Sequence, residues 1–501
     1  MRRPSAAQVL EGLLDAGSFV SWDVPTDLDH PSYADPAYVA EIAKARVTAG
    51  TDEAVITGHG RVGGRPVAVI ISEFSFLAGS IGAATAERII AAIHRATAEE
   101  LPLLAAPCSG GTRMQEGTPA FVRMIGITRA LVAHKRARLP YVVYLRHPTT
   151  GGVLASWGST GHVTFAEPEA TVGFLGPRVV EALTGAALPA HVQTSKHLAE
   201  RGIIDAVLTL DEMRATLSKL LTLTEPSVRP VPTHATSLPR KTSPDAWNSV
   251  TLTRRPDRPG ARELIALAGA ETLELSGTGR GETSAAIIVA VTALRGRPCV
   301  VVAQDRRAQA KGHALDPASL RVAQRGICLA EELGLPLVTV IDTPGAELSV
   351  SAEENAMAGE IARCVTALES LTVPRVSVML GEGCGGGALA LLAADRVLAA
   401  EHAWLSPLSP EGASFIVHRT DEHAAAMARR QRIRAVDLHA EGSVDEIIEE
   451  GDVARNPSAF LGRVADACER HLDELSTVTA AFGSTGSDGV IPKMADVLAS
   501  G

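Results

Sequence analysis

Glycine-rich turns are the features of this chain whose residue types could do chemistry. Four of them follow predicted strands: Ser109-Gly110-Gly111, Gly151-Gly152, Thr343-Pro344-Gly345 and Gly385-Gly386-Gly387. Backbone N–H groups at the start of a helix can hold an oxygen that becomes negative during a reaction, and glycine leaves no Cβ in a substrate's way. The turns therefore predict oxyanion sites built from backbone.

The turns recur at a nearly constant spacing along the chain. Gly64-Arg65-Pro66 returns as Gly296-Arg297-Pro298 after 232 residues, and Leu101-Pro102-Leu103 returns as Leu335-Pro336-Leu337 after 234 residues. Shared order and spacing indicate a duplicated domain. Two copies predict two oxyanion sites, which suits a reaction in which two carbonyl groups both gain negative charge.

Other kinds of chemistry have weaker support in the sequence. The glycine run 381–387 could be a dinucleotide-binding loop, but that loop normally lies in the first strand–helix–strand unit of its domain, and this run comes late. There is no P-loop motif, no C-x-x-C pair and no compelling His/Asp or paired-carboxylate constellation. Cys108 and Cys384, near the turns, are interpreted as packing residues rather than nucleophiles.

The elements that must position the turns alternate between strand and helix in both halves. Short apolar strands are predicted at 67–71, 103–106, 300–303 and 337–341, and helices at 83–97, 121–135, 317–333 and 352–368. The alternation predicts α/β domains. The Pro-, Ser- and Thr-rich segment 226–247 is predicted to link a first domain, 1–235, to a second, 240–501.

Composition excludes several classes of protein. A net charge of −10 and an aromatic content of 3% argue against nucleic acid as a partner. The sequence has no apolar stretch long enough to span a bilayer and no secretion signal, so we expect no membrane association. Six scattered cysteines suit a reducing cytoplasm.

Several motifs resemble, in order, those of the carboxyltransferase of bacterial acetyl-CoA carboxylase. The β-subunit motif S-G-G-A-R-M-Q-E is matched by Ser109-Gly110-Gly111-Thr112-Arg113-Met114-Gln115-Glu116. The α-subunit motifs I-D-T-P-G-A and I-G-E-G-x-S-G-G-A-L-A are matched by the segments 341–346 and 381–390. The resemblance covers about residues 50–210 and 290–450, so the chain resembles a fused β–α carboxyltransferase.

The resemblance implies two tandem crotonase-like (ββα-spiral) α/β domains, the first binding acyl-CoA and the second binding biotin. The implied reaction moves CO₂ from carboxybiotin to the α-carbon of a short acyl-CoA, most simply acetyl-CoA to malonyl-CoA in fatty acid biosynthesis. Because no A-M-K-M biotinylation motif occurs, biotin is expected on a separate biotin carboxyl carrier protein that a biotin carboxylase charges. A homo-oligomer with its active site across a dimer interface is also implied.

The resemblance assigns residues to both sites. For the thioester oxygen the donors are the N–H groups of Gly111 and Thr112, with Gly110, Gly151 and Gly152 beside them. For biotin they are Gly387 and Ala388, with Gly345, Ala346 and Gly386 beside them. Gly176, Arg113 and Arg178 are predicted at the CoA, although the two arginines could equally be structural ion-pair residues.

The chain also departs from the family pattern. Only Cys108 lies in the first 298 residues, so the β subunit's zinc ribbon is missing and no metal is expected. Glu347 stands where α subunits usually carry tyrosine, and Ala390 fits an acetyl-type pocket. Two alternatives stay open: a malonyl-thioester decarboxylase of the same fold, and a non-catalytic subunit that binds acyl-CoA or scaffolds a carboxylase.

Overall fold

The computed structural model describes residues 3–26, 30, 33, 35–225 and 245–483. Contacts divide the chain into two compact units, Met1–Thr224 with Leu275–Glu282, and Glu225–Glu274 with Thr283–Gly501. The predicted domain boundaries at 235 and 240 lie outside the described residues, as does the predicted linker up to residue 244. Among the helices described, none combines the length and the apolar character needed to cross a membrane.

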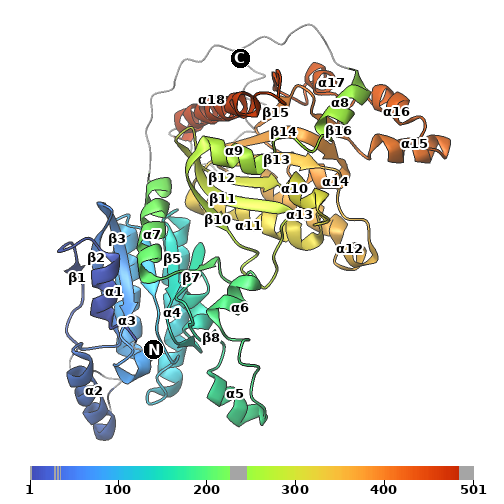
Figure 1. The fold of residues 1–501 in the computed structure, drawn as a ribbon. Helices are drawn as coiled ribbons and strands as arrows, with labels where there is room; N and C mark the ends of the chain where they lie inside the picture. The colour runs from blue at the N-terminus through green and yellow to red at the C-terminus, as the bar shows by residue number, and fades with distance from the viewer. Residues whose placement is uncertain (1–2, 27–29, 31–32, 34, 226–244, 484–501) are drawn as a thin grey trace. The chain divides into compact units, whose positions relative to one another are not determined.

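The first unit is built on a seven-stranded sheet with the order β1-β2-β3-β4-β5-β7-β9 (Figure 1). The pairs β1–β2 and β2–β3 are antiparallel, and the remaining neighbours are parallel. The strands are β1 (Val20–Ser21), β2 (Val55–Val62), β3 (Arg65–Ser72), β4 (Leu103–Ala106), β5 (Tyr141–Leu145), β7 (Val163–Ala166) and β9 (Ala206–Val207). A separate parallel pair joins β6 (Thr149–Thr150) to β8 (Val172–Gly173).

Helices of the first unit pack on this sheet because their apolar residues recur at helical spacing. α3 (Ala83–Ala98) packs against α4 (Gly117–Arg136), while α1 (Ala6–Leu13) and α7 (Leu210–Thr224) contact each other and β2 and β3. The others are α2 (Pro36–Ala49), α5 (Pro177–Thr184) and α6 (Ser195–Glu200), with short turns of helix at Leu77–Gly79 and Leu154–Gly158.

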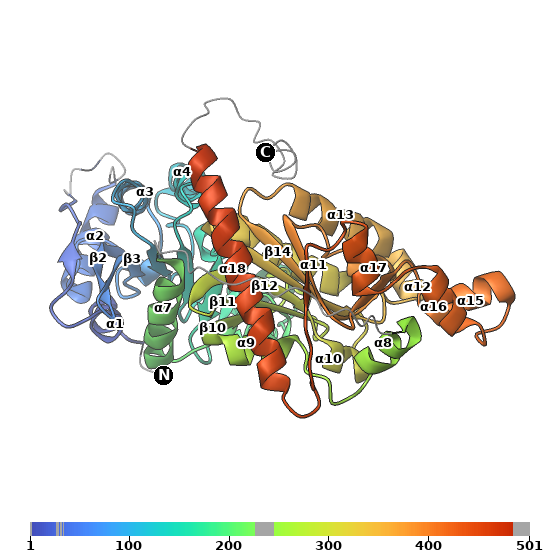
Figure 2. The same cartoon turned by 90° about the horizontal axis from the view of Figure 1, so that it is seen from above.

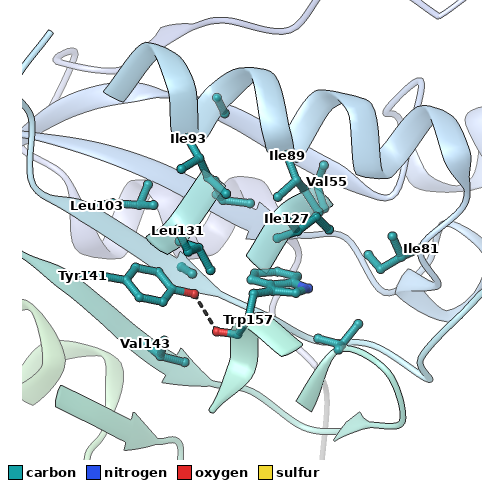
Figure 3. Packing of buried hydrophobic residues seen from close by; sticks show 14 of the residues in the cluster. Val55, Ile81, Ile89, Ile93, Leu103, Ile127, Leu131, Tyr141, Val143 and Trp157 are labelled. Atoms are coloured by element: carbon teal, nitrogen blue, oxygen red, sulfur yellow. Dashed lines mark hydrogen bonds between the residues drawn. The ribbon is translucent and has the colours of Figure 1, made fainter. Parts of the chain in front are cut away.

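A continuous aliphatic core lies between the sheet and the helices α3 and α4 (Figure 3). Ile89 and Ile93 of α3 meet Ile127 of α4 over Tyr141 and Trp157, all nearly inaccessible to solvent. The Tyr141 hydroxyl donates to the Trp157 carbonyl at 2.6 Å, so the ring's polar atom is also satisfied. Burial of this cluster holds the strand ends from which the glycine turns emerge.

The second unit repeats the plan in an eight-stranded sheet, ordered β10-β11-β12-β13-β14-β15-β17 with β16 beside β14. The pair β11–β12 is antiparallel, and the strands from β12 to β17 run parallel to their neighbours. The strands are β10 (Gly269–Leu275), β11 (Ile287–Leu294), β12 (Arg297–Gln304), β13 (Leu337–Thr343), β14 (Arg375–Cys384), β15 (Arg396–Ala400), β16 (Trp404–Ser406) and β17 (Glu446–Ile448).

Helices cover this sheet as well. α11 (Pro317–Leu333) packs on α13 (Met357–Glu369) and on β11 and β12, and the long α18 (Pro457–Gly483) crosses the sheet beside α9 (Ala261–Ala268) (Figure 2). The remaining helices are α8 (Ala246–Thr253), α10 (Arg306–Ala310), α12 (Val350–Glu354), α14 (Gly385–Leu389), α15 (Pro410–His418), α16 (Ala424–Arg430) and α17 (Ala435–Ala440).

Strand register confirms the duplication and the predicted α/β class. Ala68 of β3 pairs with Leu103 of β4, and Val300 of β12 pairs with Leu337 of β13 in the same way. One helix prediction is wrong: residues 352–368 form two helices, α12 and α13, because Ala356 adopts a left-handed φ of +61° between them.

Candidate functional site

The first glycine turn follows β4 and uses most of its own N–H groups inside the fold. Gly110 N–H donates to the Ala78 carbonyl at 2.9 Å, and Gly111 N–H donates to the Ser109 hydroxyl at 3.0 Å. Gly111 has a φ of +112°, which favours glycine. The Gly111 N–H therefore has an acceptor within the turn, and its role as an oxyanion donor stays a prediction.

The two turns of the first unit lie against each other. A Cβ placed on Gly111 would lie 3.3 Å from the Gly151 Cα, and a Cβ on Gly152 would lie 2.9 Å from the Thr112 Oγ1. The Thr150 N–H donates to the Ser109 carbonyl at 3.0 Å and ties the turns together. Within the described residues, the N–H groups of Thr112 and Gly152 donate to no acceptor. These two amides are the candidate oxyanion donors of the first unit.

Arg113, predicted at the CoA phosphates, points into the protein instead. Its side chain is completely buried, and its Nη2 lies 2.6 Å from a carboxylate oxygen of Glu53, which is buried as well. Its guanidinium also donates to the Tyr38 hydroxyl, the Ser80 carbonyl and the Thr85 hydroxyl. Arg113 is therefore a structural ion-pair residue, because its charge is already neutralised away from solvent.

The carboxylates beside Arg113 complete this buried network. Burial would raise the pKa of Glu53, but the Arg113 guanidinium, with hydrogen bonds from the Ala54 N–H and the Tyr33 hydroxyl, holds that pKa below its usual value. Glu116 accepts hydrogen bonds from the Ala83 N–H at 2.6 Å and from the Tyr38 hydroxyl at 2.5 Å. The polar residues of the 109–116 motif thus anchor the turn to α2 and α3.

The remaining predicted CoA residues lie next to α5. Gly176 immediately precedes this helix, and Arg178 is exposed on its first turn. The Gly151 N–H donates to the Phe174 carbonyl at 2.9 Å, so the segment before α5 is attached to the second turn. Contacts of Gly176 and Arg178 with CoA stay a prediction.

The turn Thr343-Pro344-Gly345 of the second unit repeats backbone N–H hydrogen bonds of the turn Ser109-Gly110-Gly111, with different side chains. Gly345 N–H donates to the Thr343 hydroxyl at 3.1 Å, as Gly111 N–H does to Ser109, and Gly345 has a φ of +134°. The Glu347 N–H donates to the Leu315 carbonyl, as the Arg113 N–H does to the Ile81 carbonyl. Ala346 therefore occupies the place of Thr112.

The glycine run 385–387 supplies the second turn of this unit. Gly385 has a φ of +60°, close to the +66° of Gly151, which makes Gly386 the counterpart of Gly152. A Cβ on Gly387 would lie 2.9 Å from the Ala346 nitrogen, so the two turns again meet. α14 begins at Gly385, and the amides of its first residues have no partner within the helix.

The correspondence between the two units changes which predicted residues are the best donors on the biotin side. Ala346, Gly386 and Gly387 have amides at the meeting point of the turns, whereas the Ala388 N–H falls where helix geometry supplies the first intrahelical acceptor. The geometry favours Ala346 and Gly386, predicted as flanking residues, over Ala388. The constant spacing of 234 residues between equivalent turns could have identified this correspondence.

Both cysteines near the turns are buried packing residues. Burial raises the pKa of Cys108 to about 12 and that of Cys384 to about 11. The Cys108 thiol donates to the His147 carbonyl at 3.0 Å. Thiols with such pKa values are protonated near neutral pH and are poor nucleophiles, which supports the interpretation from sequence.

Sequence analysis did not predict the buried polar residues next to the second site, of which Asp342 is one. Asp342 is buried, and burial raises its pKa to about 6 despite the nearby Arg306 and Arg258. Glu382 N–H donates to its Oδ1 at 3.1 Å, and its Oδ2 accepts no hydrogen bond from the described residues, although Arg306 Nε lies 3.7 Å away. The position of Asp342 next to Thr343 was the available signal, but its burial depends on strands far apart in the sequence.

Comparison with known proteins identifies the family of this chain. Residues 6–491 match the carboxyl transferase domain family. The chain is 51% identical, over 96% of each protein, to a probable biotin-dependent acyl-coenzyme A carboxylase beta3 subunit of Mycobacterium tuberculosis. It is 36% identical, over 96% of this chain and 88% of the relative, to the acetyl-coenzyme A carboxylase carboxyl transferase subunits beta/alpha of Salinispora tropica.

Solved structures share the fold. The transcarboxylase 12S core superposes with a TM-score of 0.74 at 21% identity, over 95% of this chain and 90% of that one. A single-chain, multi-domain long-chain acyl-CoA carboxylase gives 0.68 at 20% identity, over 93% of this chain and 46% of that one. The predicted tandem crotonase-like fold is confirmed. The chain belongs to the carboxyl transferase family, whose members include carboxyltransferase subunits of biotin-dependent acyl-CoA carboxylases.

Proposed function

We propose that this chain is the carboxyltransferase component of an acyl-CoA carboxylase, moving CO₂ from carboxybiotin to the α-carbon of a short acyl-CoA. The observation that carries the proposal is the pair of equivalent sites. Each has two apposed glycine turns and amides available to an oxygen, Thr112 with Gly152 and Ala346 with Gly386. A reaction with two developing oxyanions needs two such sites.

The first unit is assigned to the acyl-CoA. Loss of the α-proton from a thioester places negative charge on the thioester oxygen as an enolate forms. The amides of Thr112 and Gly152 would stabilise that charge. The absence of a Cβ on Gly111 and Gly151 lets the two turns that carry these amides lie against each other. Arg178, exposed on α5, is the remaining candidate for a contact with the CoA phosphates.

The second unit is assigned to biotin. Biotin supplies the CO₂ and a ring nitrogen that can take up the α-proton, so the protein needs no base of its own. Ala346 and the Gly385–Gly387 turn lie in close contact, because a Cβ on Gly387 would lie 2.9 Å from the Ala346 nitrogen. The Ala346 and Gly386 amides would hold the ureido oxygen, supported by the start of α14.

Partners follow from the same assignment. The chain has no A-M-K-M motif, so a separate biotin carboxyl carrier protein and a biotin carboxylase would deliver the CO₂. The Mycobacterium tuberculosis relative is named as one subunit of a carboxylase, which supports a multi-subunit enzyme. No disulfide joins the cysteines in the described part of the chain, in keeping with a reducing cytoplasm.

Exposed apolar side chains support a homo-oligomer with an active site across a dimer interface. Phe121 and Ile125 of α4 are about 60% exposed, and Phe415 and Ile416 of α15 are exposed to a similar extent. Monomeric proteins rarely leave such side chains clustered in water. Because the two units are repeats, the first unit of one protomer could cover the second unit of its partner. The transcarboxylase 12S structure is described as a hexamer assembly.

Acetyl-CoA is the proposed acyl substrate because the family resemblance assigns selection of acyl length to the position of Ala390, where alanine fits acetyl-type chains. The test incubates the purified chain with carboxylated carrier protein and a panel of acyl-CoA thioesters. Formation of malonyl-CoA as the fastest product is expected. Absence of transfer to every acyl-CoA would overturn the proposal, and loss of CO₂ from malonyl-CoA without biotin would favour the decarboxylase.

A further inference from the structure

A buried glutamine at the end of β12 connects the two glycine turns of the second unit. Gln304 is fully buried. Its Nε2 donates to the Gly387 carbonyl at 2.7 Å, and its Oε1 accepts the Asp342 N–H at 3.0 Å. Asp342 leads into the turn Thr343-Pro344-Gly345, and Gly387 belongs to the opposing turn. One side-chain amide therefore spans the segments that meet at the site.

A second glutamine fixes the conformation of one of these turns. Gln309 of α10 accepts a hydrogen bond from the Thr343 hydroxyl at 2.6 Å, and its Nε2 donates to the Asp342 carbonyl at 3.3 Å. The same Thr343 hydroxyl oxygen accepts the Gly345 N–H at 3.1 Å. Gln309 thus holds one turn in shape, while Gln304 sets its distance from the other turn.

The first unit has no equivalent of this bridge. The residue at the end of β3, where β12 ends in Gln304, is Ser72. Its hydroxyl is buried and has no hydrogen-bond partner in the described part of the chain. A parallel strand bridge joins the turns in both units, between Ser109 and Thr149 in the first and between Thr343 and Gly383 in the second. The glutamine bridge is specific to the copy assigned to biotin.

We infer that Gln304 is a positioning residue that sets the separation of the Ala346 and Gly386 amides and thereby the fit of biotin. The uncharged amide accepts from one backbone N–H and donates to one backbone carbonyl, whereas an ionised carboxylate could only accept. Losing either partner leaves a buried polar group unsatisfied, and the two turns are then free to move apart. The kinetic part of this inference rests on the proposed function, but the structural part does not.

The test uses two variants at Gln304 and a matched control in the other copy. Gln304→Glu keeps shape but loses the donor facing the Gly387 carbonyl, and Gln304→Met loses both hydrogen bonds at similar volume. Ser72→Ala removes an unpartnered hydroxyl at the equivalent strand end. With the full-length chain, we would measure KM for carboxylated carrier and for acyl-CoA, and amide hydrogen exchange in peptides covering 381–391 and 147–157.

Both Gln304 variants are expected to lose kcat/KM for the carrier by about 10- to 100-fold while KM for acyl-CoA changes by less than about twofold. Exchange should accelerate in peptide 381–391 and not in 147–157, and Ser72→Ala should match wild type. Equal exchange of peptide 381–391 in wild type and both variants would overturn the inference. If wild type transfers no CO₂, the proposed function fails, and the exchange data still decide the role of Gln304.

Discussion

The two copies of the glycine-turn site share their backbone and differ in what anchors it. Gly111 and Gly345 both take positive φ angles, and each donates its N–H to the hydroxyl two residues earlier. Two residues after Gly111, Arg113 is locked in a buried ion pair, whereas two residues after Gly345, Glu347 forms no ion pair within the described residues. The second copy uses Gln304 instead.

The two copies therefore share a backbone geometry, while the side chains that anchor it differ. The first copy is anchored by the buried ion pair between Arg113 and Glu53 and by the Tyr38 hydroxyl. The second copy is anchored by the neutral side-chain amides of Gln304 and Gln309. Replacing the anchors one at a time should therefore have different consequences in the two units.

The largest expected effect is on stability, from Arg113→Met. Removing the guanidinium leaves Glu53 buried without a partner, so unfolding should become easier by about 3–5 kcal/mol, measured by urea titration. Arg178→Gln, at an exposed position of α5, is the control and should leave the unfolding midpoint unchanged. An unchanged midpoint for Arg113→Met, with a raised KM for acyl-CoA, would return Arg113 to the phosphate-binding role.

The next effect concerns the apposition of turns in the first unit. The methyl group of Gly152→Ala would lie 2.9 Å from the Thr112 Oγ1 and push the turns apart. The rate of carboxyl transfer should fall by about 100-fold, since a displacement of about 1 Å in an active site can cost that much. Adding Thr112→Ala removes the clashing atom and should recover most of the rate. If the double variant is as slow as Gly152→Ala, the two turns do not act together.

A smaller expected effect is a pH dependence of stability that arises in only one of the two units. The folded-state pKa of Asp342 is raised by burial from 3.8 to about 6, so the folded state holds the proton more tightly than the unfolded state. Stability should therefore fall as pH rises from about 4 to about 6. Asp342→Asn should remove this fall and gain about 3 kcal/mol at pH 7.5 relative to wild type.

Urea unfolding of both proteins at pH 4.5 and pH 7.5 checks this prediction. The equivalent position in the first unit is Cys108, whose thiol stays neutral over this range because burial raises its pKa to about 12. The pH dependence of stability should thus come from the second unit. Parallel losses of stability in wild type and Asp342→Asn would contradict the role given to Asp342.

Sequence alone predicted the repeat, the α/β class and the four glycine turns, because these depend on local patterns and on motif spacing. It could not place Arg113, whose partner Glu53 lies 60 residues earlier and meets it only after the sheet has formed. It also could not find Gln304, which lies 83 residues before Gly387 and carries no motif of its own. The glycines therefore predicted the backbone geometry of the turns, but nothing in the sequence predicted which buried polar side chains pair.

The most direct test of two substrate-specific sites compares Gly111→Ala with Gly345→Ala. Both changes force alanine into a positive φ, so their strain is matched. The measurement is the loss of CO₂ from carboxylated carrier without acyl-CoA, a reaction that needs only the biotin site. Gly345→Ala should slow it by about 100-fold and Gly111→Ala by less than about twofold. Equal slowing by both variants would contradict the assignment of one copy to each substrate.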